Sequence, residues 1–309
     1  MDNVFNGPRL RSALLASVSV VALSVACPEV RAADMPPAPL YTKAPPPSAP
    51  LWTVYLEGGA FWTGGDPVLG FSELRPNVGW EGAAGVDYRF GGTPWHVSAQ
   101  VRYGRSNKST GLSGAGTFYG YSGGILGNAT HKESHLVADF AVGRDIGIGA
   151  GTAQVKLGVR VADLKANTNF SGSAAYYVGG TPTPVAAEFR SRFLGVGPRL
   201  SLEGSLPITG PWAIDYMAGV AALYGNRSLD VTLTAGGTTG SASFNDYGTV
   251  FNADAMAGLS YAFSQSMKLT AGYRFDGYWN ALRTFDNNFN FVDIDRFYHG
   301  PFLRATARF

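Results

Sequence analysis

The chain has 309 residues, of which 15% are charged, and a formal net charge of +2. This length allows either a packed core or a modest barrel, and the near-neutral charge does not suggest a nucleic-acid partner, which would need a clustered basic surface. The chain combines 41 Gly with 15 Tyr, 19 Phe and 6 Trp. That combination is typical of up-and-down β structures, in which Gly permits bends and aromatic side chains lie at interfaces.

The N-terminus has the pattern of a secretory signal peptide. Basic residues precede an apolar stretch at 13–26, and small residues follow it. We therefore predict that residues 1–32 are a signal peptide, removed after Ala32 or Ala33. No later run reaches the roughly 18 apolar residues of a membrane-spanning helix, so residence in a membrane requires a barrel.

Residues 33–51 are rich in proline, which favours extended polyproline conformations and cannot enter a sheet. We predict that this segment is a periplasmic spacer before the first strand.

From residue 52 onwards, apolar and polar residues alternate in segments close to the ~9–11 residues of a tilted outer-membrane strand. The predicted strands are 52–62, 80–90, 95–103, 136–142, 154–161, 194–206, 212–222, 251–263, 267–276 and 302–309. About ten strands result, with a range of 8–12, and bacterial single-chain barrels have even numbers. Residues 229–244 contain a Gly-Gly turn and leave two readings open: an extension of two strands above the membrane, or two further membrane strands.

The connections between these segments alternate between short and long. Short ones lie at 91–94, 145–151, 207–211 and 264–266, and long ones lie near 63–79, 104–134, 165–189, 225–248 and 277–298. This sorting is expected for periplasmic turns and extracellular loops. We therefore predict an all-β fold, a transmembrane antiparallel up-and-down β-barrel over residues 52–309 with five long extracellular loops.

The last strand places Leu303, Ala305, Ala307 and Phe309 on one face and polar residues on the other. A strand that ends the chain in an aromatic residue is common in proteins inserted into the Gram-negative outer membrane. It predicts contact with the barrel-insertion machinery and with outer-membrane lipid and lipopolysaccharide. The residues predicted to lie at the membrane interface or to serve insertion are Trp52, Trp80, Trp95, Trp212 and Phe309.

The opposite faces of the strands carry charges of both signs. The candidates to line a pore are Glu81, Asp87, Arg89, Arg102, Lys156, Arg160, Arg199, Glu203, Asp254, Arg274 and Arg304. Two arrangements remain open. The two signs pair across the interior and fill it, or they segregate on opposite walls and set a field across a water-filled constriction.

Catalytic and metal chemistry are weakly represented. His131 and His135 would stand ~13 Å apart on an extended strand, too far to share a metal, and we expect them at a solvated loop end. His299 near Asp293 and Asp295 could form a hydrolytic pair, but a polar loop position is the simpler expectation. We expect no enzyme, no metal and no cofactor.

Several glycine-rich motifs carry a family resemblance. LTAGYRF at 269–275, YWNAL at 278–282, GPFLR at 300–304 and GVGPRL at 195–200 resemble the pore-forming outer-membrane proteins related to the Legionella major outer membrane protein. The resemblance spans roughly residues 52–309 and implies a porin-like role. Cys27, the only cysteine, lies in the predicted signal peptide, so the mature chain departs from the family's cysteine content and disulfide-linked assembly is not expected.

These observations together predict an outer-membrane pore for passive diffusion of small solutes and ions, with selectivity set by inward Arg and Lys against Asp and Glu. The alternative is a closed structural or adhesive barrel whose extracellular loops bind a surface or a partner.

Overall fold

The computed structural model describes residues 51–66, 78–118, 121–148, 151–176, 181–285 and 291–309. The predicted signal peptide and all of the predicted spacer except Leu51 lie outside these residues. The described residues form ten strands, β1 Trp52–Gly65, β2 Gly79–Arg89, β3 Trp95–Phe118, β4 Tyr121–Ile148, β5 Gly151–Tyr176, β6 Thr183–Thr209, β7 Trp212–Ala235, β8 Thr238–Ala262, β9 Met267–Phe285 and β10 Phe291–Arg308. None of the described residues forms a helix able to cross a membrane.

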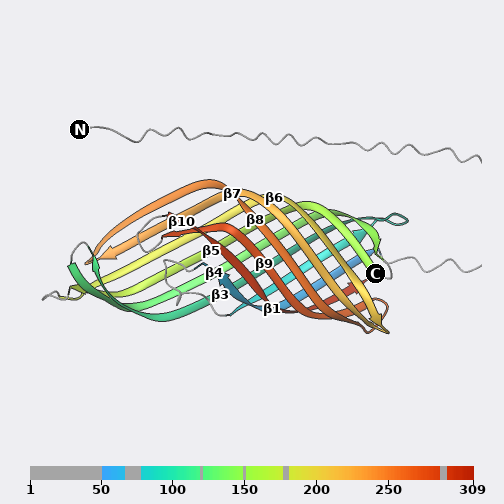
Figure 1. Cartoon of the computed structure of the whole chain (residues 1–309), viewed down its shortest axis with the longest axis horizontal. Helices are drawn as coiled ribbons and strands as arrows, with labels where there is room; N and C mark the ends of the chain where they lie inside the picture. The colour runs from blue at the N-terminus through green and yellow to red at the C-terminus, as the bar shows by residue number, and fades with distance from the viewer. Residues whose placement is uncertain (1–50, 67–77, 119–120, 149–150, 177–180, 286–290) are drawn as a thin grey trace, which may run out of the picture. The chain divides into compact units, whose positions relative to one another are not determined.

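The strands close into one antiparallel barrel in which each pairs with its neighbours in sequence (Figure 1). β1 and β10 complete the ring, and the ladder runs to the end of the chain. The Trp52 amide donates to the Phe309 carbonyl at 2.8 Å, and the Phe309 amide donates back at 3.0 Å. The all-β, up-and-down fold with ten strands is confirmed.

The hairpin within residues 229–244 extends two strands rather than adding two. β7 and β8 pair continuously up to a turn at Gly236 and Gly237, whose φ angles are +57° and +84°. Two successive left-handed residues define a type I′ turn, which glycine adopts without strain. The count is therefore ten and not twelve.

Most of the residues predicted as long loops are paired strand. Within 104–134, β3 continues to Phe118 and β4 begins at Tyr121, in register throughout. In this part of the chain apolar and polar residues no longer alternate, although the backbone hydrogen bonds between β3 and β4 continue. The side-chain pattern therefore does not reveal the strand. One end of the barrel carries the short turns, together with the start of β1 and the end of β10, and we call it the short-turn end. The opposite end carries the long hairpins, and we call it the long-hairpin end.

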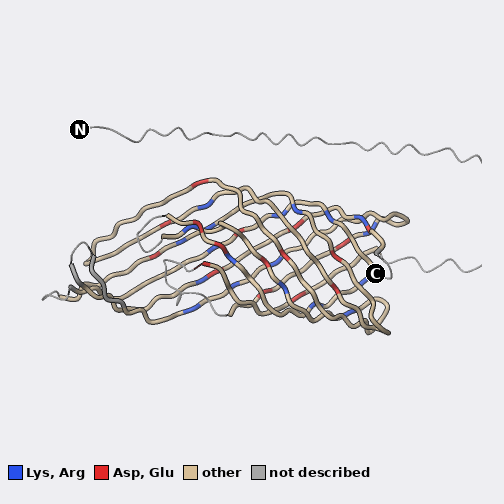
Figure 2. Tube along the Cα trace, viewed as in Figure 1, with Lys and Arg blue, Asp and Glu red and all other residues tan. Residues whose placement is uncertain are grey.

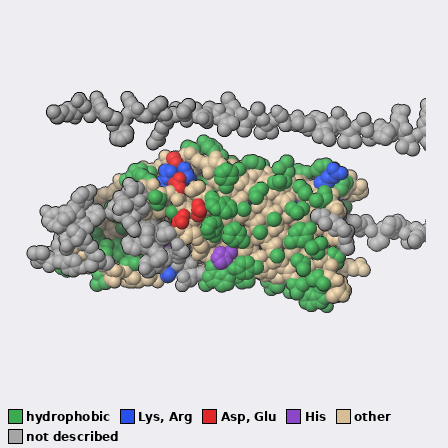
Figure 3. Space-filling view, viewed as in Figure 1, with side chains coloured by type: hydrophobic (Ala, Val, Ile, Leu, Met, Phe, Trp, Pro, Cys, Tyr) green, Lys and Arg blue, Asp and Glu red, His purple; other side chains and the backbone are tan. Residues whose placement is uncertain are grey.

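The outer wall is apolar between two bands of aromatic side chains. Leu56 is 70% exposed and Phe140 is 60% exposed, which a protein surrounded by water would avoid. Figure 3 shows hydrophobic side chains over the middle of one face and charged ones toward its ends.

The first band, at the short-turn end, contains Trp52, Trp95, Trp212 and Phe309, and the second contains Trp62, Trp80, Tyr103, Tyr224 and Tyr247, all exposed. Trp52 and Trp62 stand ten residues apart on β1. At ~3.3 Å per residue and a tilt of ~40° they are separated by roughly 25 Å along the barrel axis, the height of an outer-membrane apolar band.

Candidate functional site inside the barrel

Strand alternation directs the predicted pore-lining side chains into the barrel, where every one of them forms an ion pair. Even Arg89, near the short-turn end, contacts Asp145 at 2.9 Å. Positive and negative residues alternate along and between strands instead of occupying opposite walls (Figure 2). Of the two arrangements left open by the sequence, the structure has the paired one.

Arg160 lies at the centre of this network and is 0% exposed. From β5, its guanidinium donates two hydrogen bonds of 2.7 Å to Asp139 on the neighbouring β4. It also reaches Asp254 on β8 at 2.9 Å and the amide oxygen of Asn252. Asn252 donates in turn to Asp276 at 2.8 Å. One arginine therefore links walls that are not neighbours in the sheet.

Arg199 on β6 completes the same cluster by donating to Asp254 at 2.7 Å. Gly219 faces the lumen from the neighbouring strand β7. A Cβ atom added there would stand 2.7 Å from the Arg199 guanidinium and 2.9 Å from the Asp254 carboxylate. The absence of a side chain at Gly219 provides the space in which this ion pair forms.

A second charged group lies against β1. Arg274 on β9 and Arg304 on β10 both bind Glu57, Arg304 at 2.7 Å. Arg274 also contacts Glu81 at 3.1 Å, and Glu81 accepts a hydrogen bond from the ring of His135 at 2.8 Å if that nitrogen is protonated. Glu57 thus holds the two arginines at the seam between the first and last strands.

An apolar layer covers the charged layer on the side of the long hairpins. Its buried members are Phe61, Val137, Ala162, Leu164, Ala166, Phe193, Ala221, Leu223, Val250, Tyr278, Ala281, Leu282, Ile294 and Tyr298. β9 supplies part of it by leaving regular alternation: Asn280 has φ +56°, and both Ala281 and Leu282 are fully buried. The Cα atoms of β9 and β5, four strands apart, approach within 8 Å. The walls are therefore drawn together at this level.

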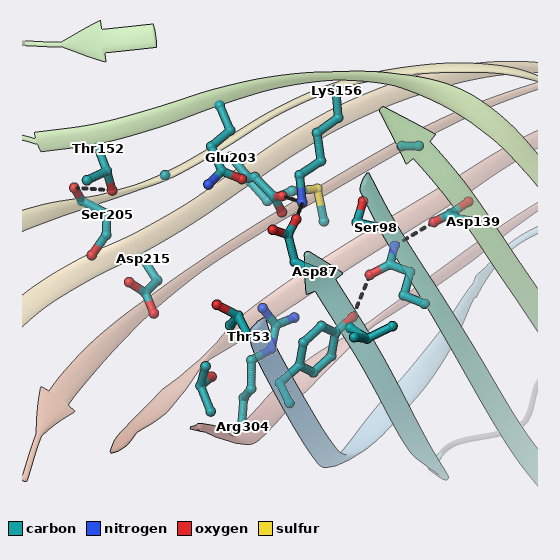
Figure 4. A pocket seen from close by; sticks show the side chains of 18 of the residues that line it. Thr53, Asp87, Ser98, Asp139, Thr152, Lys156, Glu203, Ser205, Asp215 and Arg304 are labelled. Atoms are coloured by element: carbon teal, nitrogen blue, oxygen red, sulfur yellow. Dashed lines mark hydrogen bonds and ion pairs between the residues drawn. The ribbon is translucent and has the colours of Figure 1, made fainter. Parts of the chain in front are cut away.

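A polar cavity of about 370 Å³ occupies the short-turn half of the interior (Figure 4). Lys156 projects into it between Asp87 and Glu203 and binds both, Asp87 at 3.0 Å. Lys268 binds Asp215 at 2.6 Å nearby. We call this cavity the vestibule; Arg199 and Asp139 of the central network also line it.

The histidines predicted at a solvated loop end are buried instead. His131 and His135 are 0% and 1% exposed and face inward from β4. His131 contacts Thr168 and Glu133, each at 2.7 Å, and Glu133 accepts from Arg296 at 2.9 Å. The prediction was wrong because it treated residues 104–134 as loop, whereas β4 continues there and alternation turns these side chains into the interior. Arg296 escaped notice because residues 277–298 were likewise predicted as a loop, whereas β10 begins at Phe291.

Another cluster that the sequence did not indicate lies farther toward the long hairpins. Arg227 binds Asp246 at 2.9 Å and Asp293 at 2.7 Å, and Arg283 contacts the same two carboxylates at 2.8 Å and 3.0 Å. Partial burial acts to raise the pKa of Asp246, but the hydrogen bond and charge of Arg227 outweigh it and hold that pKa below its usual value. This four-residue group, the outer cluster, joins β7, β8, β9 and β10.

The conceivable hydrolytic pair does not form. His299 points away from the interior between Trp62 and Tyr273, and its ring nitrogen lies 2.7 Å from the Tyr273 hydroxyl. Asp293 belongs to the outer cluster, and Asp295 accepts from the Asn280 amide at 2.8 Å. Within the described ranges, no three His, Cys, Asp or Glu side chains are grouped as a metal site would need.

Comparison with known proteins gives one family and several distant structures. No curated protein matches the sequence. The outer membrane protease OmpT from Escherichia coli is 9% identical with a TM-score of 0.38, covering 85% of this chain and 95% of that one. A major outer membrane protein from Thermus thermophilus is 14% identical with a TM-score of 0.36, covering 84% and 99%. The translocator domain of autotransporter NalP from Neisseria meningitidis is 11% identical with a TM-score of 0.29, covering 86% and 90%.

These structural similarities are too low to bear on function. The family model described as the Legionella pneumophila major outer membrane protein precursor, in contrast, matches residues 54–309, which is nearly all of the barrel. The chain belongs to this family of outer-membrane β-barrel proteins.

Proposed function

We propose that this protein is a closed outer-membrane barrel that anchors extended hairpins at the cell surface. The observation that carries the proposal is the burial of Arg160, whose guanidinium joins β5 to both β4 and β8 with no exposed surface. In the closed barrel that we propose, this side chain and its partners block a water-filled path through the middle of the barrel.

Two consecutive layers support closure. The carboxylates around Arg160 are paired within the charged layer, although Arg199 Nε and Arg102 Nη1 are buried without a hydrogen-bond partner among the described residues. Water would have to displace the bidentate contact between Arg160 and Asp139 to pass this layer. The apolar layer beyond it, with Phe61 and Phe193 fully packed, offers water few hydrogen-bonding partners, chiefly the buried hydroxyls of Tyr278 and Tyr298. Solutes would have to cross both.

The long-hairpin end supplies the functional surface in this proposal. Strands β3 to β8 run well beyond the second aromatic band, and their polar walls are rich in Ser, Thr and Asn. With the short-turn end in the periplasm, these hairpins stand outside the cell, where they are available to bind a surface or a partner. Phe309, exposed at the rim of the closing strand, is in the right place to be presented to the insertion machinery.

A porin-like diffusion pore is the second candidate, and the vestibule is the observation that favours it. Its 370 Å³ is lined by charges of both signs and reaches the central network, so half of a solute path is already hollow. Conduction would require the Arg160 and Arg199 contacts to open.

Catalysis is not part of the proposal. Thr168, His131 and Glu133 are connected by hydrogen bonds in the order hydroxyl, imidazole and carboxylate, which is an arrangement used for nucleophilic catalysis. All three side chains are buried, so no substrate can reach the hydroxyl in this structure.

Liposome swelling tests the proposal. Proteoliposomes containing the mature barrel should swell no faster than empty liposomes in small sugars or amino acids, while a general porin reconstituted in parallel should swell them. Swelling that depends on solute size would overturn the closed barrel in favour of the pore.

A further inference from the structure

Exposed basic side chains gather on the outer face of four adjacent strands. They are Arg105 on β3, Lys132 on β4, Lys165 on β5 and Arg190 and Arg192 on β6. We call these five residues the basic band.

Strand register arranges the basic band in two rows. Arg105 pairs with Ser134, Ser134 with Lys165, and Lys165 with Arg192, so one row crosses all four strands. The second row runs from Lys132 through Asn167 to Arg190. Adjacent strands are ~4.8 Å apart, so each row spans roughly 10–15 Å and interleaves cations with hydrogen-bonding hydroxyl and amide groups.

Acidic neighbours neutralise only part of the band. Asp163 binds Lys165 and Arg192, and Glu188 binds Arg190. Arg105 and Lys132 form no ion pair with any other residue that the structure describes. Two cations are therefore available to an external anion, beside Lys165, Arg190 and Arg192, whose charges are partly neutralised by these acids.

The height of the band on the wall indicates its surroundings. On β3, Arg105 is the next outward-facing residue after Tyr103 of the second aromatic band. On β6, Arg192 is the outward-facing residue immediately before the exposed Leu194. Aromatic bands lie at the level of lipid headgroups. The basic band thus meets the membrane where the hydrocarbon ends and phosphate begins.

The opposite wall differs at this height. On β1, β9 and β10 the outward positions at this level hold Trp62, Trp279 and Phe297, whereas Trp80 borders the basic band as the register partner of Arg105. The positive charge is therefore confined to one side of the barrel and is not a general collar.

We propose that the basic band is a binding site for a phosphorylated glycolipid of the outer leaflet, the class to which the lipid anchor of lipopolysaccharide belongs. The inference rests on the proposed orientation, with the long hairpins outside. A disaccharide headgroup with a phosphate at each end matches a row of cations some 10–15 Å long, and its acyl chains would lie against the apolar wall at Ala138, Val161 and Val196, one outward row below Asp163.

Native mass spectrometry of the purified mature barrel in detergent tests this site. The probes are diphosphoryl lipid A, the same lipid with both phosphates removed, and phosphatidylglycerol. Because each cation near a lipid surface contributes modestly to anion binding, the double variant Arg105→Gln/Lys132→Gln should bind diphosphoryl lipid A roughly 10–30-fold more weakly.

The matched control is Arg144→Gln/Arg308→Gln, which removes two cations at the short-turn end. It should change the affinity less than about 2-fold, and the unmodified barrel should prefer diphosphoryl lipid A to both other probes. Equal weakening by the two double variants would overturn the site, because only total charge would then matter. Equal binding of phosphatidylglycerol would overturn the glycolipid assignment.

These readings are independent of whether the barrel is closed. Liposome swelling or ion conductance by the unmodified barrel would contradict the proposed function without changing its affinity for lipid A. Loss of the lipid site would leave the ion pairs inside the barrel unchanged.

Discussion

Arg160 on β5 contacts Asp254 on β8 at 2.9 Å, joining two strands that are separated in the sheet by β6 and β7. The same guanidinium is bidentate with Asp139. A link of this kind depends on the whole ring, because neither strand alone holds the two groups at this distance. The network therefore couples closure of the barrel to closure of its lumen.

Removing Arg160 should destabilise the barrel strongly. Arg160→Ala leaves the Asp139 and Asp254 carboxylates buried and partly uncompensated, which typically costs about 3–5 kcal/mol. The unfolding midpoint in urea, followed by the heat-modifiable gel shift of the refolded protein, measures the effect. Arg89→Ala is the control, since its pair with Asp145 is about a third exposed and should contribute about 0–1 kcal/mol. Similar losses for both variants would show that burial of the central pair is unimportant.

The inward turn of β9 depends on Asn280, which adopts a left-handed conformation at φ +56°. Asn and Gly tolerate this region, but a β-branched residue does not. We expect Asn280→Val to lower the unfolding free energy by about 1–3 kcal/mol and Asn280→Gly to change it little, both measured by urea titration. If the two variants behaved alike, the backbone conformation would not be what shapes this part of the apolar layer.

Acid should loosen the outer cluster before it unfolds the barrel. The pKa of Asp246 is lower in the folded protein than in the unfolded chain, so the carboxylate contributes stability that is fully present above its unfolded pKa, roughly 4. That stability is lost as the pH falls below this value and through the lowered pKa. Amide hydrogen exchange in the β7–β8 hairpin should therefore accelerate as the pH falls below about 4, beyond its intrinsic pH dependence.

Asp246→Asn provides the control for that experiment, because it cannot titrate. Its hairpin should exchange faster than the unmodified one at neutral pH and show no further acid-induced opening of its own. Retention of the acid step in Asp246→Asn would assign the effect to another group.

Orientation can be read from cysteine labelling in intact cells. The only natural cysteine lies in the predicted signal peptide, so single substitutions give an unambiguous signal. Thr239→Cys, beside the Gly236–Gly237 turn, should react with a membrane-impermeant maleimide on whole cells, and Gln265→Cys, in a short turn, should react only after permeabilisation. The reverse pattern would place the long hairpins in the periplasm and remove the basis of the lipid site.

How far the sequence predicts this molecule depends on the surroundings of each strand. Where one face meets lipid and the other the interior, alternation revealed the strand and the side that Arg102 or Glu203 faces. Beyond the apolar band the outward positions are mostly polar, so the extensions of β3 to β8 and the first part of β10 left no clear pattern, and Arg227 and Arg296 were missed. Pairing across the lumen could not be predicted either, because Arg160 on β5 meets Asp254 on β8 only when the ring of strands is closed.

Single-channel recording in planar bilayers tests the closed interior most directly. The mature barrel should give no discrete current steps at moderate voltage, under conditions in which a control porin conducts. Stable steps from the unmodified protein, with ion preference altered by Arg199→Ala but not by the lipid-facing Val159→Ala, would contradict the account and establish a pore.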